Sequence, residues 1–265
     1  MKKVLLTTLF GLSVVFGKGV VVLNPASVEI FYMLKCEDKI AAIAKTQSSE
    51  IWPKDKTDKL LSVGTYMKPN LEKIVALSPS MVITSFGSSS IIPDLDRLKI
   101  KHEEMPSDSL EDIYKSISMV GAMCHKEEAA SKLLASYKQR LASLSKDKLT
   151  NKKAVFFYAT ANLMAFGKGT LPDDIFKTLG VKNLADNLSG KTPIITPEFL
   201  IEQNPDFMVI AGASSVKSFL SEHPLLANTK AAKNNKIFVV SQSAMLRGSP
   251  RIVDEIEKLH GEFIK

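Results

Sequence analysis

Short apolar runs alternate along this chain with longer segments in which apolar residues recur at helical spacing. Strands that alternate with amphipathic helices are typical of parallel sheets built from strand–helix–strand units. In the first half, strands are expected at 20–23, 40–44 and 81–84, with helices at 25–34, 71–77 and 110–120. A second series starts with a strand at 154–158 and continues through 175–179, 199–203, 208–210 and 237–240 to a helix beginning near 252. The pattern predicts an α/β fold with mostly parallel sheets.

The longest helical pattern, over 126–144, lies between the two series and contains no glycine or proline. We therefore predict two Rossmann-like lobes joined by one long backbone helix. The expected boundaries are 18–124 for the N-terminal lobe, 125–147 for the linking helix and 148–265 for the C-terminal lobe.

An internal repeat supports two related lobes. Residues 69–83 parallel residues 197–210: in each, a glutamate (Glu72 or Glu198) opens a helix, a proline seven residues later ends it, and a Met-Val-Ile strand follows. The same helix–stop–strand unit therefore occurs once in each predicted lobe.

The N-terminus has the pattern of a secretory signal peptide. Lys2 and Lys3 precede an apolar stretch, Val4–Phe16, which is followed by Gly17. A buried first strand or a membrane anchor is the alternative, but the stretch is too short to span a bilayer comfortably. We predict that residues 1–17 are removed near Gly17 and that the protein is exported to the periplasm.

Composition excludes several classes of protein. With 45% hydrophobic and 24% charged residues, the chain is neither disordered nor a multi-span membrane protein. Its net charge of +7 includes no run of five like charges, so it fits an anionic small ligand or simple solubility. No nucleic-acid reader motif accompanies the charge, and no nucleic-acid partner is expected.

Catalytic motifs are weak. The four histidines share no HxxxH or HExxH spacing, and the chain has no G-x-S-x-G elbow, Walker loop or Rossmann glycine set. We predict no catalytic residues and therefore no enzyme. The two cysteines, Cys36 and Cys124, could pair in an oxidising compartment, but each follows a helical apolar pattern, which favours two buried free thiols.

The duplicated glutamates Glu72 and Glu198 allow two interpretations. An acid in the first turn of a helix stabilises it through the macrodipole, so plain capping is one. Capping does not explain why the same acid recurs in each lobe. Two such acids suit docking onto two basic sockets of a two-fold symmetric partner.

The chain after residue 17 resembles the substrate-binding proteins of vitamin B12, haem and ferric-siderophore ABC importers. The matching stretches, in order, are Val20–Ile30, Val63-Gly64, Pro69–Ile74, Ser109–Gly121, Leu179–Asp186, Pro197-Glu198, Asn204–Asp206 and Ser249–Arg251. One departure is Ser80, where the family usually has an acidic residue after proline. The chain also lacks the histidine clusters of zinc and manganese binders with this architecture.

The resemblance implies a ligand cleft between the lobes and a partner permease dimer in the inner membrane with its ATPase. It also implies that Glu72 and Glu198 meet arginines on the two permease subunits. The binding protein itself is expected to be a monomer that carries its cargo without a covalently attached cofactor.

Loops after the predicted strands supply the candidate ligand-binding residues. Aromatic rings suit a flat macrocycle or catecholate rings, and basic groups suit anionic oxygens. The candidates are Trp52, Tyr66, Lys68, Phe86, Tyr158, Phe166 and Arg247. Core packing is the alternative for Phe86 and Phe166.

An iron chelate, haem or a ferric siderophore, is the predicted small-molecule cargo. Haem binders of the resembling family ligate iron with a tyrosine just after the Val-Gly pair, and Tyr66 stands one position later than that residue, so it is a metal ligand only if the cargo is haem. Cobalamin, a nickel chelate or another metal species remain alternatives, as does a sensor without an importer.

Overall fold

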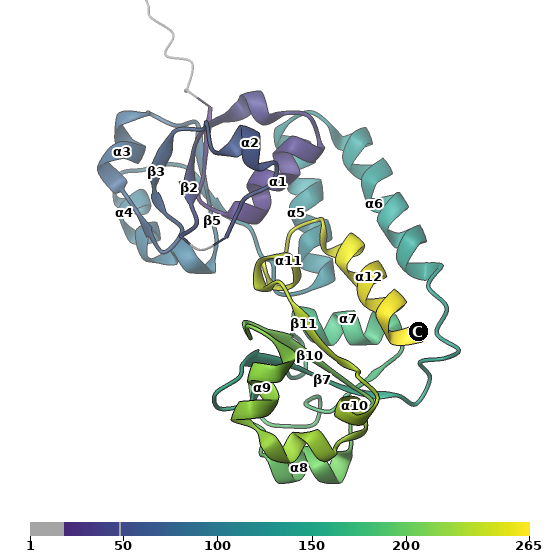
Figure 1. The fold of residues 1–265 in the computed structure, drawn as a ribbon. Coiled ribbons are helices and arrows are strands. Elements are labelled where there is room, and N and C mark those ends of the chain that lie inside the picture. The colour runs from purple at the N-terminus through teal and green to yellow at the C-terminus, as the bar shows by residue number, and fades with distance from the viewer. Residues whose placement is uncertain (1–18, 48) are drawn as a thin grey trace, which may run out of the picture.

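The computed structural model describes residues 19–47 and 49–265 (Figure 1). The predicted signal peptide, residues 1–17, lies outside them. Figure 1 shows two α/β lobes, with the long helix α6 running along one side of the molecule from one lobe toward the other. Within 19–47 and 49–265, no helix combines the length and apolarity needed to cross a bilayer.

The N-terminal lobe is built on a six-stranded sheet of order β4-β3-β2-β1-β5-β6. All neighbours are parallel except β3 and β4, which form a hairpin. The strands are β1 Val20–Val22, β2 Ile40–Lys45, β3 Ser62–Thr65, β4 Lys68–Pro69, β5 Met81–Thr84 and β6 His102–Glu104. Its helices are α1 Pro25–Met33, α2 Lys54–Thr57, α3 Leu71–Ala76 and α4 Ile92–Arg97, with short 3₁₀ turns η1 Glu37–Lys39 and η2 Phe86–Ile91.

The C-terminal lobe has a five-stranded sheet in which β11-β10-β7-β8 are neighbours and β9 also pairs with β7. Only the β7–β8 pair is antiparallel among the pairs between these strands. The strands are β7 Lys153–Ala159, β8 Met164–Ala165, β9 Lys182–Asn183, β10 Phe207–Ala211 and β11 Ile237–Val240. The helices are α7 Leu171–Leu179, α8 Pro197–Gln203, α9 Val216–Glu222, α10 Lys230–Lys233, α11 Gln242–Leu246 and α12 Ile252–Ile264, with η3 Pro224–Asn228.

Two long helices, α5 Leu110–Met123 and α6 Glu127–Ala142, connect the lobes. α5 packs against α1 of the first lobe and α7 of the second, and α6 packs against α12. One apolar cluster therefore runs without interruption through both lobes, from Val28 and Ile117 to Phe176 and Phe263. The predicted two-lobe α/β fold with a long backbone helix is confirmed.

The prediction of two free thiols is wrong, because Cys36 and Cys124 form a disulfide with their Cα atoms 6.1 Å apart. Both are buried as expected, at 3% and 6% exposure. Cys36 follows α1 and Cys124 follows α5, and these helices pack against each other. Their packing, which the local sequence does not reveal, brings the two thiols together.

The sequence pattern missed several short elements, among them β3, β4, β6 and α11. β6 reads His-Glu-Glu because it is an edge strand with polar side chains. The β3–β4 hairpin and the helix α11, which begins after the N-cap Ser241, were not predicted either.

Candidate functional site

A cavity of about 450 Å³ lies between the lobes. Both lobes contribute to it, mostly through segments that leave the carboxyl ends of parallel strands, where α/β sheets bind ligands. Its lining residues are Asn24, Pro25, Thr46, Ser49, Tyr66, Phe86, Ser107, Asp108, Tyr158, Ser241, Gln242, Ser243, Leu246 and Arg247. Four predicted site residues, Tyr66, Phe86, Tyr158 and Arg247, thus share one cavity.

Tyr66 and Phe86 form the aromatic wall of the N-terminal lobe. The Tyr66 hydroxyl accepts a hydrogen bond from the Gly87 backbone N–H at 3.2 Å. The ring lies so close to this backbone that a Cβ on Gly87 would be 2.2 Å from it, so any other residue there would displace the Tyr66 ring from its present position. Phe86 is 85% exposed, which excludes the alternative that it packs in the core. An apolar ring left so open next to a cavity is a ready contact for a ligand.

Tyr158 and Phe166 form the facing wall of the C-terminal lobe. Their rings meet edge to face with centroids 5.6 Å apart, and Phe166 also packs on Phe156 at 5.7 Å. Phe166 is half-buried and lines an adjoining cavity of about 270 Å³. Tyr158, Leu246 and two further residues line both cavities, so the second extends the first along this wall.

The floor of the cavity includes the start of helix α1. The Asn24 side chain accepts a hydrogen bond from Ala26 N at 2.9 Å and donates one to the Met105 carbonyl at 3.2 Å, so the helix begins at Pro25. Asn24 and Pro25 both line the cavity. The positive end of the α1 macrodipole therefore faces the cavity and favours anionic groups there.

Arg247 lines the cavity, but its guanidinium is held by the N-terminal lobe. It forms an ion pair with Glu29 of α1 at 2.8 Å and donates to Ser49 Oγ at 2.8 Å and to the Glu50 carbonyl. The Glu29 and Arg247 side chains are 1% and 10% exposed. Ser249 Oγ donates to the other Glu29 oxygen. We call Glu29, Ser49, Arg247 and Ser249 the polar bridge, because they join the lobes beside the cavity.

Trp52 and Lys68 lie elsewhere, since neither is among the described residues that line the two cleft cavities. Trp52 is 39% exposed, and the Arg251 guanidinium lies 5.9 Å from the centroid of its ring. The Trp52 backbone N–H donates to Glu29 at 3.3 Å, so this segment continues the polar bridge. Lys68 is exposed on the hairpin strand β4.

Sequence reasoning missed other lining residues: Thr46, Ser107, Asp108, Ser241 and Gln242. The sequence Pro-Ser-Asp-Ser at 106–109 is typical of a turn. The strand before it, β6, is polar and was not predicted, so nothing in the sequence indicated that this turn follows the carboxyl end of a strand. Among the described residues, no group of three or more His, Cys, Asp or Glu side chains is arranged to hold a metal ion.

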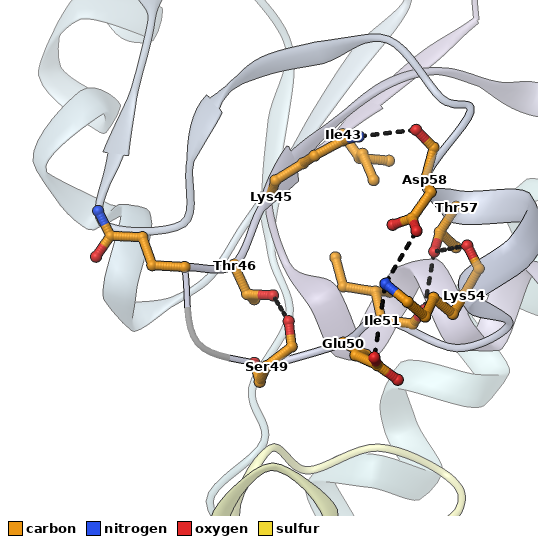
Figure 2. Close-up of a pocket in the computed structure, with 10 residues that line it drawn as sticks. Ile43, Lys45, Thr46, Ser49, Glu50, Ile51, Lys54, Thr57 and Asp58 are labelled. Carbon is orange, nitrogen blue, oxygen red and sulfur yellow. Dashed lines mark hydrogen bonds and ion pairs between the residues drawn. The ribbon is translucent and has the colours of Figure 1, made fainter.

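A cavity of about 440 Å³ lies within the N-terminal lobe, between β2 and α2. Figure 2 shows the Lys54 ammonium between the carboxylates of Asp58 and Glu50, with Nζ–O distances of 3.0 and 3.5 Å. Its described lining includes no aromatic side chain and comes from one lobe only. Several of its polar side chains pair with groups of the same lining, and no aromatic ring is available for stacking, so the aromatic cavity between the lobes is the stronger candidate site.

The duplicated glutamates both reach solvent. Glu72 and Glu198 are exposed in the first turns of α3 and α8, whose N-caps Asn70 and Thr196 accept backbone hydrogen bonds at 2.9 and 3.2 Å. Figure 1 shows α3 and α8 at the outer ends of the two lobes, away from α6. The Asn70 and Thr196 side chains cap these helices, and the two acids add a favourable charge at the same ends while their carboxylates remain exposed.

Comparison with known proteins matches residues 20–244 to a family model described as periplasmic binding protein. An uncharacterised ABC transporter substrate-binding lipoprotein of Bacillus subtilis, YvrC, is 26% identical over 91% of this chain and 78% of its own. A vitamin B12-binding protein of Vibrio parahaemolyticus is 23% identical, covering 93% of this chain and 90% of its own. The crystal structure of the periplasmic haem-binding protein HutB of Vibrio cholerae superposes with a TM-score of 0.78 at 22% identity, covering 91% of this chain and 97% of that one.

Proposed function

Because the chain belongs to the periplasmic binding protein family, we propose that it is the solute-binding component of an ABC importer and that its cargo is an iron chelate, haem or a ferric siderophore. The observation that carries this proposal is the cavity of about 450 Å³ between the lobes, with aromatic rings facing it from both sides. The protein captures the chelate there and delivers it to a permease dimer and its ATPase.

The chemistry of the cavity supports a flat or aromatic anionic cargo. Tyr66, Phe86 and Tyr158 offer ring faces and edges for stacking. The start of α1 supplies positive potential at the cavity. Lys68 and Lys168 are exposed outside the lining and add positive charge to the surface of the protein. Arg247 reaches the cavity as part of the polar bridge, so its charge is already neutralised by Glu29.

Tyr66 is the proposed iron ligand if the cargo is haem. Tyr66 lines the cavity, and its hydroxyl accepts a hydrogen bond from the Gly87 N–H. The structural neighbour that binds haem supports this cargo, and the relative that binds vitamin B12 keeps cobalamin as the alternative.

Export and docking complete the proposal. The charged and apolar start of the sequence supports cleavage near Gly17 and a periplasmic location. The exposed pair Glu72 and Glu198, one on each lobe, supports docking of a monomer onto basic side chains of two permease subunits.

A titration of the purified protein followed by visible absorption tests the cargo. We expect haem or a ferric siderophore to bind and Phe86→Ala to weaken that binding about tenfold, since stacking on an exposed ring is lost. If haem is the cargo, Tyr66→Phe shifts the Soret band while Trp52→Phe does not. Binding of cobalamin alone, with neither iron chelate bound, would contradict the proposed cargo.

A further inference from the structure

An exposed β-branched residue follows each of the duplicated glutamates by three positions. Val75 on α3 is 42% exposed and Ile201 on α8 is 39% exposed. Residues three apart in a helix lie on the same face, so Val75 stands beside Glu72 and Ile201 beside Glu198. Each lobe thus presents an acid next to an apolar side chain.

These apolar side chains are not explained by the core of either lobe. Ile74 and Leu200, the preceding residues in each helix, are fully buried and fasten the helix to its lobe. The equivalence extends to the helix ends, because α3 is followed by Ser78 with φ 47° and α8 by Asn204 with φ 48°. Two unrelated accidents of exposure would not be expected at matching positions of two repeats.

We propose that Val75 and Ile201 are docking residues that fit apolar surfaces on the two permease subunits, each beside the basic side chain that meets the neighbouring glutamate. This inference rests on the proposed importer function and adds a second kind of contact to it. Two related acid–apolar pairs require a partner that offers the complementary basic–apolar surface twice, which a two-fold symmetric permease does.

The two contacts have different physical behaviour. A charge pair at an exposed rim steers association and is screened by salt. An apolar contact is not weakened by screening, and a β-branched side chain on a helix has few rotamers to lose on binding. The apolar contacts therefore hold the complex at ionic strengths where the charge contacts fade.

The test uses the cognate permease–ATPase complex in lipid nanodiscs and measures the Kd of the binding protein. We expect Val75→Ser and Ile201→Ser each to weaken binding about fivefold and the double variant about 25-fold. The matched control is Val239→Ser on β11, since Val239 is also 39% exposed but lies on neither docking helix. It should leave the Kd unchanged, and all variants should keep wild-type thermal unfolding and cargo affinity.

Salt separates the two contacts. In Glu72→Gln/Glu198→Gln the residual affinity should be independent of salt, and adding Val75→Ser/Ile201→Ser should remove it. If Glu72→Lys/Glu198→Lys abolishes binding but the serine variants bind as the wild type does, the apolar inference is overturned and the importer function stands. If neither set changes binding, the proposed docking itself fails. If sedimentation shows that the chain dimerises through these faces, the occupant is a second copy and the inference is also overturned.

Discussion

The lobes of this protein meet in two regions of opposite chemistry. Along the backbone helices they share a continuous apolar cluster, which we call the backbone core, in which Phe176 packs between Phe156 and Phe263 at centroid distances of 6.2 and 6.5 Å. Beside the cavity they are joined by the polar bridge, whose centre is the Glu29–Arg247 ion pair. The first contact excludes water and the second borders the site.

The two contacts between the lobes differ in how readily they can rearrange. Apolar packing is close and does not tolerate sliding, so the backbone core sets the angle between the lobes. The polar bridge is directional rather than close-packed, and Ser49 and Arg247 line the cavity, where a ligand could offer them other hydrogen-bond partners. The polar bridge is therefore the contact between lobes that can respond to cargo, while the backbone core stays as it is.

The largest expected effect is on the backbone core. Phe176 is fully buried, so Phe176→Ala should lower the free energy of unfolding by about 4 kcal/mol through lost transfer energy and a cavity. Urea denaturation measures this. Cargo affinity of the folded variant should stay within about twofold, and Phe176→Leu should cost clearly less. A large loss of cargo affinity in folded Phe176→Leu would show that the two regions are not separable.

The polar bridge should show the next largest effect. Glu29→Gln keeps the shape of the side chain but leaves the buried Arg247 charge uncompensated, which should cost about 3 kcal/mol in the same denaturation assay. Glu29→Gln/Arg247→Gln should be less destabilised than the sum of the single changes, because no unpaired charge remains. Unlike the Phe176 variants, Glu29→Gln should also change cargo affinity. If Glu29→Gln left the cargo affinity unchanged, the polar bridge would have no part in cargo binding.

The smallest effect is expected at the rim of the backbone core, where Arg140 of α6 binds Glu257 and Asp254 of α12. Arg140→Ala should cost about 1 kcal/mol, since these groups are partly exposed and screened by solvent. The hydrogen bond from Arg140, with its charge, lowers the pKa of Glu257 despite partial desolvation.

A carboxylate with a lowered pKa stabilises the fold above its unfolded-state pKa, and this contribution is lost as the pH falls through the folded pKa. The difference between wild type and Arg140→Ala should therefore be full well above the ordinary pKa of a glutamate and should shrink as the pH falls through the lower folded-state pKa of Glu257. A difference that does not depend on pH would assign the effect of Arg140 to the packing of its side chain.

Local patterns were sufficient for the longer helices, most of the central strands and the repeat. Strand β5 was predicted with its observed bounds, and α1 and α3 each extended one residue beyond the observed end, because period and caps are properties of neighbouring residues. Phe86 was found because it follows strand β5 and Tyr158 because it stands near the end of strand β7, and the carboxyl ends of parallel strands lie at one edge of a sheet. Trp52 and Lys68 satisfied the same rule and still lie outside the described cavity lining.

The sequence by itself determined the α/β alternation, the two related lobes and the repeated glutamates, since each is encoded within one or two turns of chain. Only the tertiary structure decided that Cys36 pairs with Cys124 and that the Arg247 guanidinium forms an ion pair with Glu29. These partners are 88 and 218 residues apart. No local preference specifies such a contact, because it forms only when packed helices and lobes bring distant side chains into the same few ångströms.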